Sequence, residues 1–378
     1  MIGNFPSSIN PTKGTVVVAM SGGVDSSVAA VMLHKQGYNV IGVTMKLWDF
    51  EEVGGNINHE SGCCSLESFN DAREICVNLG LPHYVMNFSR EFHAAVVEDF
   101  IDEYLSGRTP NPCIQCNMKI KWKTLLDKAQ YLGADYIATG HYARTTFNTA
   151  THRFELLRAV DFTKDQSYAL WGIQQNSLSK TIFPLGHLTK TEVRNLAHEY
   201  NLNTADKKES QEICFIADND YHRLLKQFDP KLEAQIENGP LMDIDGNLVG
   251  YHRGYPFYTI GQRRGLGGGF KSPMYVVDID AKSNTVIIGN DDALKTQFFT
   301  VKDVNLISRA AIEEPVRAAI KIRYNDEGHA GKIIPLTQTS LKIEFDEPQK
   351  SVTPGQSAVF FDGDRVIGGG IIEERISE

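Results

Sequence analysis

The first half of the chain alternates short apolar runs with longer stretches in which apolar residues recur at helical spacing. β-Branched, almost wholly apolar runs predict strands at residues 15–20, 40–45, 83–88 and 135–139. Helices are predicted at residues 24–36, 66–79, 90–105, 119–132 and 190–200. Continuous apolar strands separated by helices are typical of a parallel sheet covered on both faces. We therefore predict a Rossmann-like α/β domain in this half.

The pattern changes at residue 274, where short alternating runs separated by turn residues begin. Strands are predicted at 275–279, 285–288, 298–306, 316–324, 331–336, 341–345, 358–361 and 365–371. This spacing predicts a C-terminal antiparallel β-barrel or sandwich. We expect a flexible tail over residues 1–13, the α/β domain over 14–210, a small central domain over 211–273 and the β-domain over 274–378. The polar, Gly-containing stretch 50–62 is predicted to be a loop.

Composition and charge narrow the class of protein. Of 378 residues, 42% are hydrophobic and 22% charged, as in ordinary globular proteins, and no apolar run approaches the roughly 20 residues of a membrane span. The net charge of -9 argues against indiscriminate nucleic-acid binding but permits a local basic groove, for example over residues 119–123. We expect a cytoplasmic protein with no membrane segment. Six cysteines in such a chain are catalytic, metal-binding or buried rather than a disulfide scaffold.

The segment Ser21-Gly22-Gly23-Val24-Asp25-Ser26-Ser27 joins a predicted strand to a predicted helix. Unpaired N–H groups and the dipole of a helix start attract anions, and the glycines let the backbone approach phosphate oxygens. The segment is neither a Walker A motif nor a dinucleotide fingerprint. Asp25 would repel phosphates unless a cation intervened, so we expect Mg²⁺ to act through it. The alternative is a Gly-rich turn with no ligand.

Two further segments present cysteines. In residues 107–117, prolines 110 and 112 stiffen a loop that leads into the basic stretch 119–123, and Cys116 is expected at a helix N-terminus, with a depressed pKa. Cys214 lies in a short apolar run. The Cys113/Cys116 pair also has the spacing of half a zinc site, and Cys214 alone is compatible with a small buried residue. We assign Cys63, Cys64 and Cys76 to the buried class.

These motifs together resemble a known family. The loop at 21–27 resembles the PP-loop of ATP pyrophosphatases, which cleave ATP between the α and β phosphates. The chain as a whole is similar to the tRNA-specific 2-thiouridylase family (MnmA/TrmU), through residues 107–122, 138–144, 164–167, 211–216 and 354–356. These matches run in order along almost the whole chain. The resemblance implies a PP-loop domain, a small central domain and a C-terminal β-barrel.

The resemblance also implies a reaction. ATP would adenylate the C2 oxygen of the wobble uridine in tRNAs for Lys, Glu and Gln, and a persulfide would then deliver sulfur to C2. By position, Cys214 would carry the persulfide and Cys116 would be the nucleophile that releases the sulfur, leaving a transient disulfide between them. The sulfur would come from a cysteine desulfurase through a sulfur-relay protein. The target base must leave the anticodon stack to be reached.

The same resemblance implies a set of binding residues. Contacts to ATP are expected from Ala19, Met20, Ser21, Gly22, Gly23, Val24, Asp25, Ser26, Met45 and Gly140. Contacts to the target base are expected from Asn111, Pro112 and Cys113. Contacts to tRNA are expected from His141, Lys164, Asp165, Gln166, Arg323, Tyr324 and Gln356.

Several alternatives stay open on sequence alone. Cys113, Cys116 and Cys214 together match the three-cysteine set with which related thiolases hold a [4Fe–4S] cluster, which would serve the same reaction. A PP-loop ligase for a small molecule, such as argininosuccinate or GMP synthetase, shares the loop but needs no reactive cysteine pair. A tRNA-binding or sulfur-carrier protein without catalysis is a third alternative. Lys321 and Arg323 are expected on one strand face, which suits either an RNA backbone or solvent.

Overall fold

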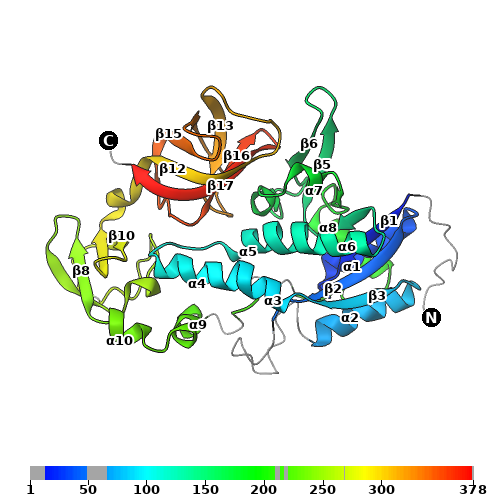
Figure 1. The fold of residues 1–378 in the computed structure, drawn as a ribbon, viewed down its shortest axis with the longest axis horizontal. Coiled ribbons are helices and arrows are strands. Elements are labelled where there is room, and N and C mark those ends of the chain that lie inside the picture. Colours follow the sequence, from blue (N-terminus) through cyan, green and yellow to red (C-terminus); the bar gives the residue numbers. More distant parts are fainter. Residues whose placement is uncertain (1–12, 49–65, 209–212, 217–219, 268, 377–378) are drawn as a thin grey trace. The chain divides into compact units, whose positions relative to one another are not determined.

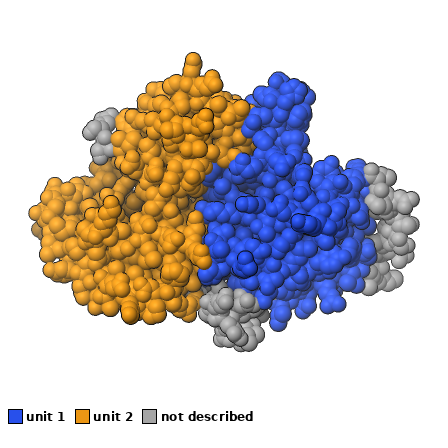
Figure 2. All heavy atoms as spheres, in the orientation of Figure 1, with its two compact units in different colours: residues 1–96, 113–219, 364–366 blue, residues 97–112, 220–363, 367–378 orange. Residues whose placement is uncertain are grey.

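The computed structural model describes residues 13–48, 66–208, 213–216, 220–267 and 269–376. The chain divides into two compact units (Figure 2): unit 1 comprises residues 1–96, 113–219 and 364–366, and unit 2 comprises 97–112, 220–363 and 367–378. The expected loop at 50–62, Cys63, Cys64 and all but the last residue of the expected tail lie outside the described residues. No helix in the described ranges is long and apolar enough to cross a membrane.

Unit 1 is built on a five-stranded parallel sheet (Figure 1). Its strands, in the order in which they pair, are β3 (His83–Asn87), β2 (Asn39–Lys46), β1 (Thr15–Ala19), β4 (Tyr136–Ala138) and β7 (Thr181–Ile182). Val16, Val17 and Val18 are fully buried although alternate side chains point to opposite faces, so both faces of the sheet are covered. The predicted Rossmann-like parallel sheet is confirmed.

Helix α1 (Val24–Lys35), which follows the loop at 21–27, is packed on two sides. Val31 lies in a cluster with Ile75 of α2 (Leu66–Asn78), whereas Val28 lies in another with Val193 of α8 (Lys190–Glu199). This burial holds the start of α1 in place.

The rest of unit 1 adds a hairpin and further helical segments. The hairpin pairs β5 (Ala143–Asn148) with β6 (Arg153–Arg158), and the short helix α7 spans Gln175–Leu178. The predicted helix at 90–105 is divided into α3 (Ser89–Phe92), a π-helical turn over His93–Val97 and α4 (Glu98–Leu105), the last of these in unit 2. The predicted helix at 119–132 starts earlier, with α5 (Pro112–Gln115), the π-helix η2 (Cys116–Leu125) and α6 (Leu126–Tyr131).

Unit 2 contains a four-stranded sheet with two short helices, α9 (Tyr221–Phe228) and α10 (Leu232–Ile236). Its strands pair in the order β10 (Tyr275–Asp280), β11 (Thr285–Gly289), β8 (Gly239–Asp243) and β9 (Leu248–His252). The strands expected at 275–279 and 285–288 therefore form, but they pair with each other and, through β11, with β8, and not with the strands that follow. The expected domain limits at 210/211 and 273/274 stay predictions.

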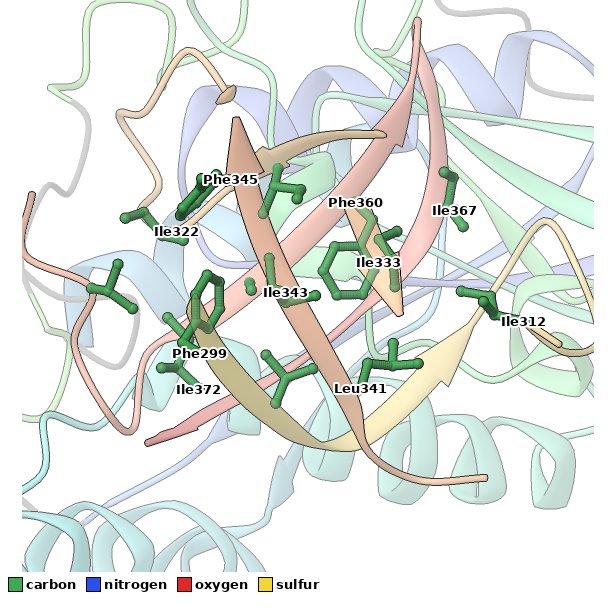
Figure 3. Close-up of a cluster of buried hydrophobic side chains, with 14 residues drawn as sticks. Phe299, Ile312, Ile322, Ile333, Leu341, Ile343, Phe345, Phe360, Ile367 and Ile372 are labelled. Carbon is green, nitrogen blue, oxygen red and sulfur yellow. The ribbon is translucent and has the colours of Figure 1, made fainter. Parts of the chain in front are cut away.

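The C-terminal strands of unit 2 form a closed antiparallel barrel, as predicted. They are β12 (Lys295–Leu306), β13 (Val316–Lys321), β14 (His329–Pro335), β15 (Leu341–Lys350), β16 (Ser357–Asp362) and β17 (Arg365–Ile376). Pairing of β12 with both β15 and β17 closes the barrel. Its interior is filled by fully buried side chains such as Phe299, Ile333, Ile343 and Phe360 (Figure 3). Apolar residues at alternate positions of each strand supply this core.

One strand of the barrel ends earlier than predicted. β13 stops at Lys321, so Arg323 lies in the following turn, where the Asp326 carboxylate accepts a hydrogen bond from the Ile322 N–H at 3.1 Å. Lys321 is buried, Arg323 is exposed, and Ile322 points into the barrel core (Figure 3). The prediction that Lys321 and Arg323 share one strand face is therefore wrong, because the strand ends between them.

Candidate functional site

The loop at 21–27 joins the carboxyl end of β1 to the start of α1. Gly23 is the N-cap of α1 and offers no side-chain cap, which leaves the first-turn N–H groups for a ligand. The Ser26 and Ser27 hydroxyls donate to the Gly23 carbonyl at 3.2 and 2.7 Å, and Ser26 Oγ accepts from the Ser21 N–H at 3.2 Å. Gly22 has φ +69°, and a Cβ there would lie 2.2 Å from the Ser68 carbonyl oxygen. Only glycine fits this turn.

The other residues expected around ATP lie at the same edge of the sheet. β1 pairs with β2 on one side and β4 on the other, so strand order reverses here, and ligands of open α/β sheets bind at such a point. Gly140 follows β4, and a Cβ on it would lie 2.7 Å from the Ser26 backbone nitrogen. Met45 lies near the end of β2. The structure therefore brings Gly140 against the start of α1 and places Met45 on the neighbouring strand end.

Asp25 is held by two partners within unit 1. The Lys190 ammonium donates to both carboxylate oxygens of Asp25, at 2.7 and 2.8 Å, and the Tyr142 hydroxyl donates to Oδ1 at 2.7 Å. Lys190 is 9% exposed, so the lysine side of this ion pair is shielded from water, whereas the Asp25 side chain is 29% exposed. The lysine neutralises the carboxylate that would otherwise repel a phosphate chain.

Lys190 is itself fixed in place at the first position of α8. Thr189 and Glu192 form a capping box at this helix start, and the Asp161 carboxylate accepts from the Lys190 N–H at 3.0 Å. Sequence analysis missed Lys190. The capping box Thr-Lys-Thr-Glu is visible in the sequence, but a pairing across 165 positions has no local signal.

The expected zinc and cluster sites do not fit these residues, and Asp25 does not fit its expected role toward Mg²⁺. Both oxygens of Asp25 are engaged by Lys190, so the carboxylate is not arranged as a Mg²⁺ ligand. Across the described part of the chain, no three His, Cys, Asp or Glu side chains are placed to hold a metal ion. Cys113, Cys116 and Cys214 all lie in that part, and they do not form the arrangement needed for zinc or a [4Fe–4S] cluster.

Cys116 does not lie at a helix N-terminus, as the sequence analysis expected. The helical segment begins with Pro112, so the first turn contains Cys113, which is exposed, whereas Cys116 is 8% exposed and opens the π-helix η2. Proline commonly occupies the first position of a helix, which is why the segment starts there. π-Helical turns are rare and frequent at functional sites. The Asn117 side chain fixes η2 by donating to the Ala169 carbonyl at 2.9 Å.

Cys214 is placed by the aromatic residue that follows it. Phe215 is 1% exposed, and its ring lies 5.5 Å from that of Phe92, which in turn packs against Trp48 at 5.8 Å. Cys214 itself is half-buried. Cys76, by contrast, lies in the core under the sheet, where burial raises the pKa of its thiol to about 11. A thiol with so high a pKa is unreactive at neutral pH, in keeping with its assignment as a buried residue.

His141 is neutral at physiological pH. Burial, with a smaller contribution from the charge of Lys121, holds the pKa of its imidazole well below the ordinary value. Its Nδ1 is 2.7 Å from Thr139 Oγ1, and its ring packs against both Trp122 and Phe183, whose rings also contact each other. A contact from His141 to tRNA would therefore be a hydrogen bond or a stacking contact and not a charge on phosphate.

The low pKa of His141 predicts a loss of stability in acid. The unfolded chain takes up a proton at this position below about pH 6.5 whereas the folded chain does not, so the free energy of unfolding falls as pH drops. Replacing His141 with Gln should reduce the slope between pH 6.5 and 5 by up to about 1.4 kcal/mol per pH unit. Urea unfolding across this range measures it. An unchanged slope would contradict a neutral His141. A residual slope is expected in the variant, because desolvation also lowers the pKa values of His83 and His252.

The turn at residues 164–167 is linked to the loop at 21–27 through Tyr142. Asp165 is buried and accepts hydrogen bonds from the Ala159 N–H at 3.0 Å and the Ser167 hydroxyl at 2.8 Å, so its carboxylate holds the turn together. Gln166 Oε1 accepts from the Tyr142 N–H at 2.9 Å. Lys164 is half-buried in the same turn. Asp165 and Gln166, both expected to contact tRNA, are therefore engaged within the protein.

In unit 2, the remaining residues expected to contact tRNA differ in exposure. Arg323 is exposed and donates weakly to the Lys350 carbonyl at 3.4 Å, and Tyr324 is 45% exposed. Gln356 points inward, and its amide donates to the Thr109 and Pro110 carbonyls at 3.0 and 2.8 Å.

The fold and the geometry of the loop at 21–27 define the class of protein. It is an α/β protein whose loop is suited to bind phosphate and lies where the strand order of the sheet reverses. Comparison with known families agrees. The profile described as tRNA methyl transferase HUP domain matches residues 14–218, and the tRNA methyl transferase PRC-barrel domain matches residues 230–290. The Aminomethyltransferase beta-barrel domain matches residues 296–372.

Curated relatives match along nearly the whole chain. The tRNA-specific 2-thiouridylase MnmA of Salinibacter ruber is 49% identical over 363 residues, covering 96% of this chain and 95% of the relative. That of Cytophaga hutchinsonii is 48% identical over 368 residues, covering 97% and 99%. A solved 4-thiouridine synthetase–RNA complex with bound ATP is similar over 58% of this chain and 51% of its own, at 18% identity and TM-score 0.35. The chain belongs to the tRNA-specific 2-thiouridylase (MnmA) family.

Proposed function

We propose that this chain is an ATP-dependent sulfurtransferase that replaces the C2 oxygen of the wobble uridine with sulfur in tRNAs for Lys, Glu and Gln. The observation that carries the proposal is the match, 49% identical over 96% of the chain, to a relative named for tRNA 2-thiolation. The loop at 21–27, Cys116 and Cys214 belong to the same compact unit, which supports a site that both activates the base and transfers sulfur.

In the first step, the uridine C2 oxygen attacks the α-phosphorus of ATP, the bond to the β-phosphate breaks, and pyrophosphate leaves. The N–H groups at the start of α1 are suited to hold the phosphate oxygens. Lys190 keeps Asp25 neutralised while they do so. Adenylation converts the C2 oxygen into a leaving group. Asn111, Pro112 and Cys113 are proposed to lie against the extruded base.

In the second step, the outer sulfur of a Cys214 persulfide attacks C2 and expels AMP, which leaves the base linked to Cys214 through two sulfur atoms. The Cys116 thiolate then attacks the Cys214 sulfur. The sulfur–sulfur bond to the base breaks, 2-thiouridine is released, and a Cys116–Cys214 disulfide forms. Two electrons from a thiol reductant restore the cysteines. A relay protein that carries a persulfide, charged by a cysteine desulfurase, is the proposed sulfur source, and the cytoplasm the proposed compartment.

Pyrophosphate release tests the substrate of the first step. We expect release to require an anticodon stem-loop with uridine at the wobble position, and to be absent when that uridine is replaced by cytidine. The matched stem-loop differs at one base only, so it controls for RNA binding in general. Release driven by citrulline or xanthosine monophosphate without RNA would instead indicate a small-molecule ligase.

A further inference from the structure

Prolines reduce the number of hydrogen-bond donors in the chain segment that leads to the target-base residues. Pro110 and Pro112 have no N–H, so this stretch cannot join a ladder, and the carbonyls of Thr109 and Pro110 need donors from elsewhere. The Gln356 amide nitrogen donates to both, at 3.0 and 2.8 Å. Pro110 is buried, so an unsatisfied carbonyl at this position would be costly.

The turn that carries Gln356 is rigidly held. The Gln356 N–H donates to the Thr353 carbonyl at 3.2 Å, and the Gln356 carbonyl accepts from the Ile372 N–H of β17 at 2.8 Å. The carbonyl of Pro354, two positions before Gln356, accepts from the Thr109 N–H at 2.9 Å. The segment is therefore bonded to this turn through the backbone of Thr109 as well as through the Gln356 side chain.

Gly355 lets the segment lie directly on the turn. It has φ +92°, and a Cβ there would lie 2.5 Å from Glu103 Oε2 and 2.6 Å from the Thr109 carbonyl oxygen. Glu103 accepts from Arg108 Nε at 2.8 Å, and Arg108 also donates to the Ile372 carbonyl at 3.1 Å. Residues 103–110 are thus clamped to the turn at 353–356 and the end of β17 within unit 2.

We propose that Gln356 is a positioning residue: its amide holds Thr109 and Pro110 so that Asn111, Pro112 and Cys113 meet the target uridine. This inference rests on the proposed function. A glutamine amide nitrogen carries two hydrogens, and the two carbonyls use both. The remaining amide oxygen, Oε1, can only accept hydrogen bonds. Because a phosphate oxygen is also an acceptor, Gln356 has no hydrogen-bond donor left for it. Gln356 thus acts on tRNA through the segment and not by donating to the RNA backbone.

The variant Gln356→Met keeps the length of the side chain and removes both donors. We expect the Kd for tRNA and its salt dependence to stay within about twofold of wild type, since no phosphate contact is lost. The single-turnover rate of thiolation at saturating tRNA should fall roughly 10- to 100-fold, as for a misplaced reacting group. Gln349→Met is the matched control, because the Gln349 amide donates only to the nearby Glu347 carbonyl of the same barrel. It should behave as wild type.

Hydrogen exchange gives a readout that does not depend on activity. In Gln356→Met, amide hydrogens in peptides covering residues 104–113 should exchange faster than in wild type. Peptides from β14 and β15 should exchange as in wild type, and this agreement would also establish that the barrel is folded. A weakened Kd for tRNA with an unchanged rate at saturation would overturn the inference in favour of direct tRNA binding. Unchanged exchange would overturn it as well. If wild type makes no 2-thiouridine, the proposed function fails, and the exchange result still tests the clamp.

Discussion

Replacing Cys214 with serine is expected to abolish formation of 2-thiouridine while ATP binding and tRNA-dependent pyrophosphate release persist. The serine hydroxyl cannot carry a persulfide, but the loop at 21–27 and its phosphate-binding groups are untouched. Phe215, which holds this segment against Phe92, is also unchanged, so the local structure should survive. The measurement pairs a pyrophosphate assay with mass spectrometry of the digested tRNA from the same reaction.

Two matched cysteine variants sharpen this result. Cys116→Ser should also stop release of product, but it should leave the tRNA joined to Cys214, and a thiol reductant should release that tRNA. Cys76→Ala removes a thiol buried in the core of unit 1 and should leave thiolation intact. Full thiolation by Cys214→Ser would show that another residue carries the sulfur.

Replacing Lys190 with methionine is expected to raise the KM for ATP roughly 10- to 100-fold, since it leaves a partly buried carboxylate facing the phosphates without its counter-charge. The effect is smaller than for a fully buried pair because the Asp25 side chain is 29% exposed and water screens it in part. Adding Mg²⁺ should recover part of the loss, because the released Asp25 carboxylate then attracts a cation. Steady-state kinetics of pyrophosphate release at several Mg²⁺ concentrations measure both effects.

The double variant Asp25→Asn/Lys190→Met is the internal control. It removes both charges, so it should bind ATP better than Lys190→Met alone and should show no recovery with Mg²⁺. Lys128→Met breaks a lysine–carboxylate pair with Glu91 in the same unit and should leave the KM unchanged. If the free-energy losses in ATP binding of the two single variants simply add in the double variant, the two side chains do not act by neutralising each other.

The parts of the site predicted from sequence are those with local signals. The loop at 21–27 was predicted between a strand and a helix, because glycine, serine and the change of periodicity all occur within a few residues. The alternation of apolar and polar residues predicted the barrel. It did not predict where β13 ends, because Ile322 continues the apolar pattern beyond Lys321, the last residue of the strand. The sequence led us to expect a helix start at Cys116, whereas the helical segment begins at Pro112. Proline, which is common at the first position of a helix, was the signal for this earlier start.

The contacts that sequence could not predict are long-range. Lys190 and Asp25 are 165 positions apart, and Gln356 lies 246 positions from Pro110. Family resemblance suggested Gln356 as a tRNA contact, whereas its amide is satisfied by protein carbonyls. Resemblance identifies which positions matter, but only the folded chain shows which partner each side chain has.

Mass spectrometry of tRNA is the most direct test of the central claim. Unmodified tRNA carrying a wobble uridine is incubated with the protein, ATP, Mg²⁺ and a persulfide source, and the digested nucleosides are then analysed. We expect 2-thiouridine at the wobble position, formed only when ATP is present and in proportion to the pyrophosphate released. Wobble uridine that stays unmodified while the protein hydrolyses ATP, or sulfur found at another position, would contradict it.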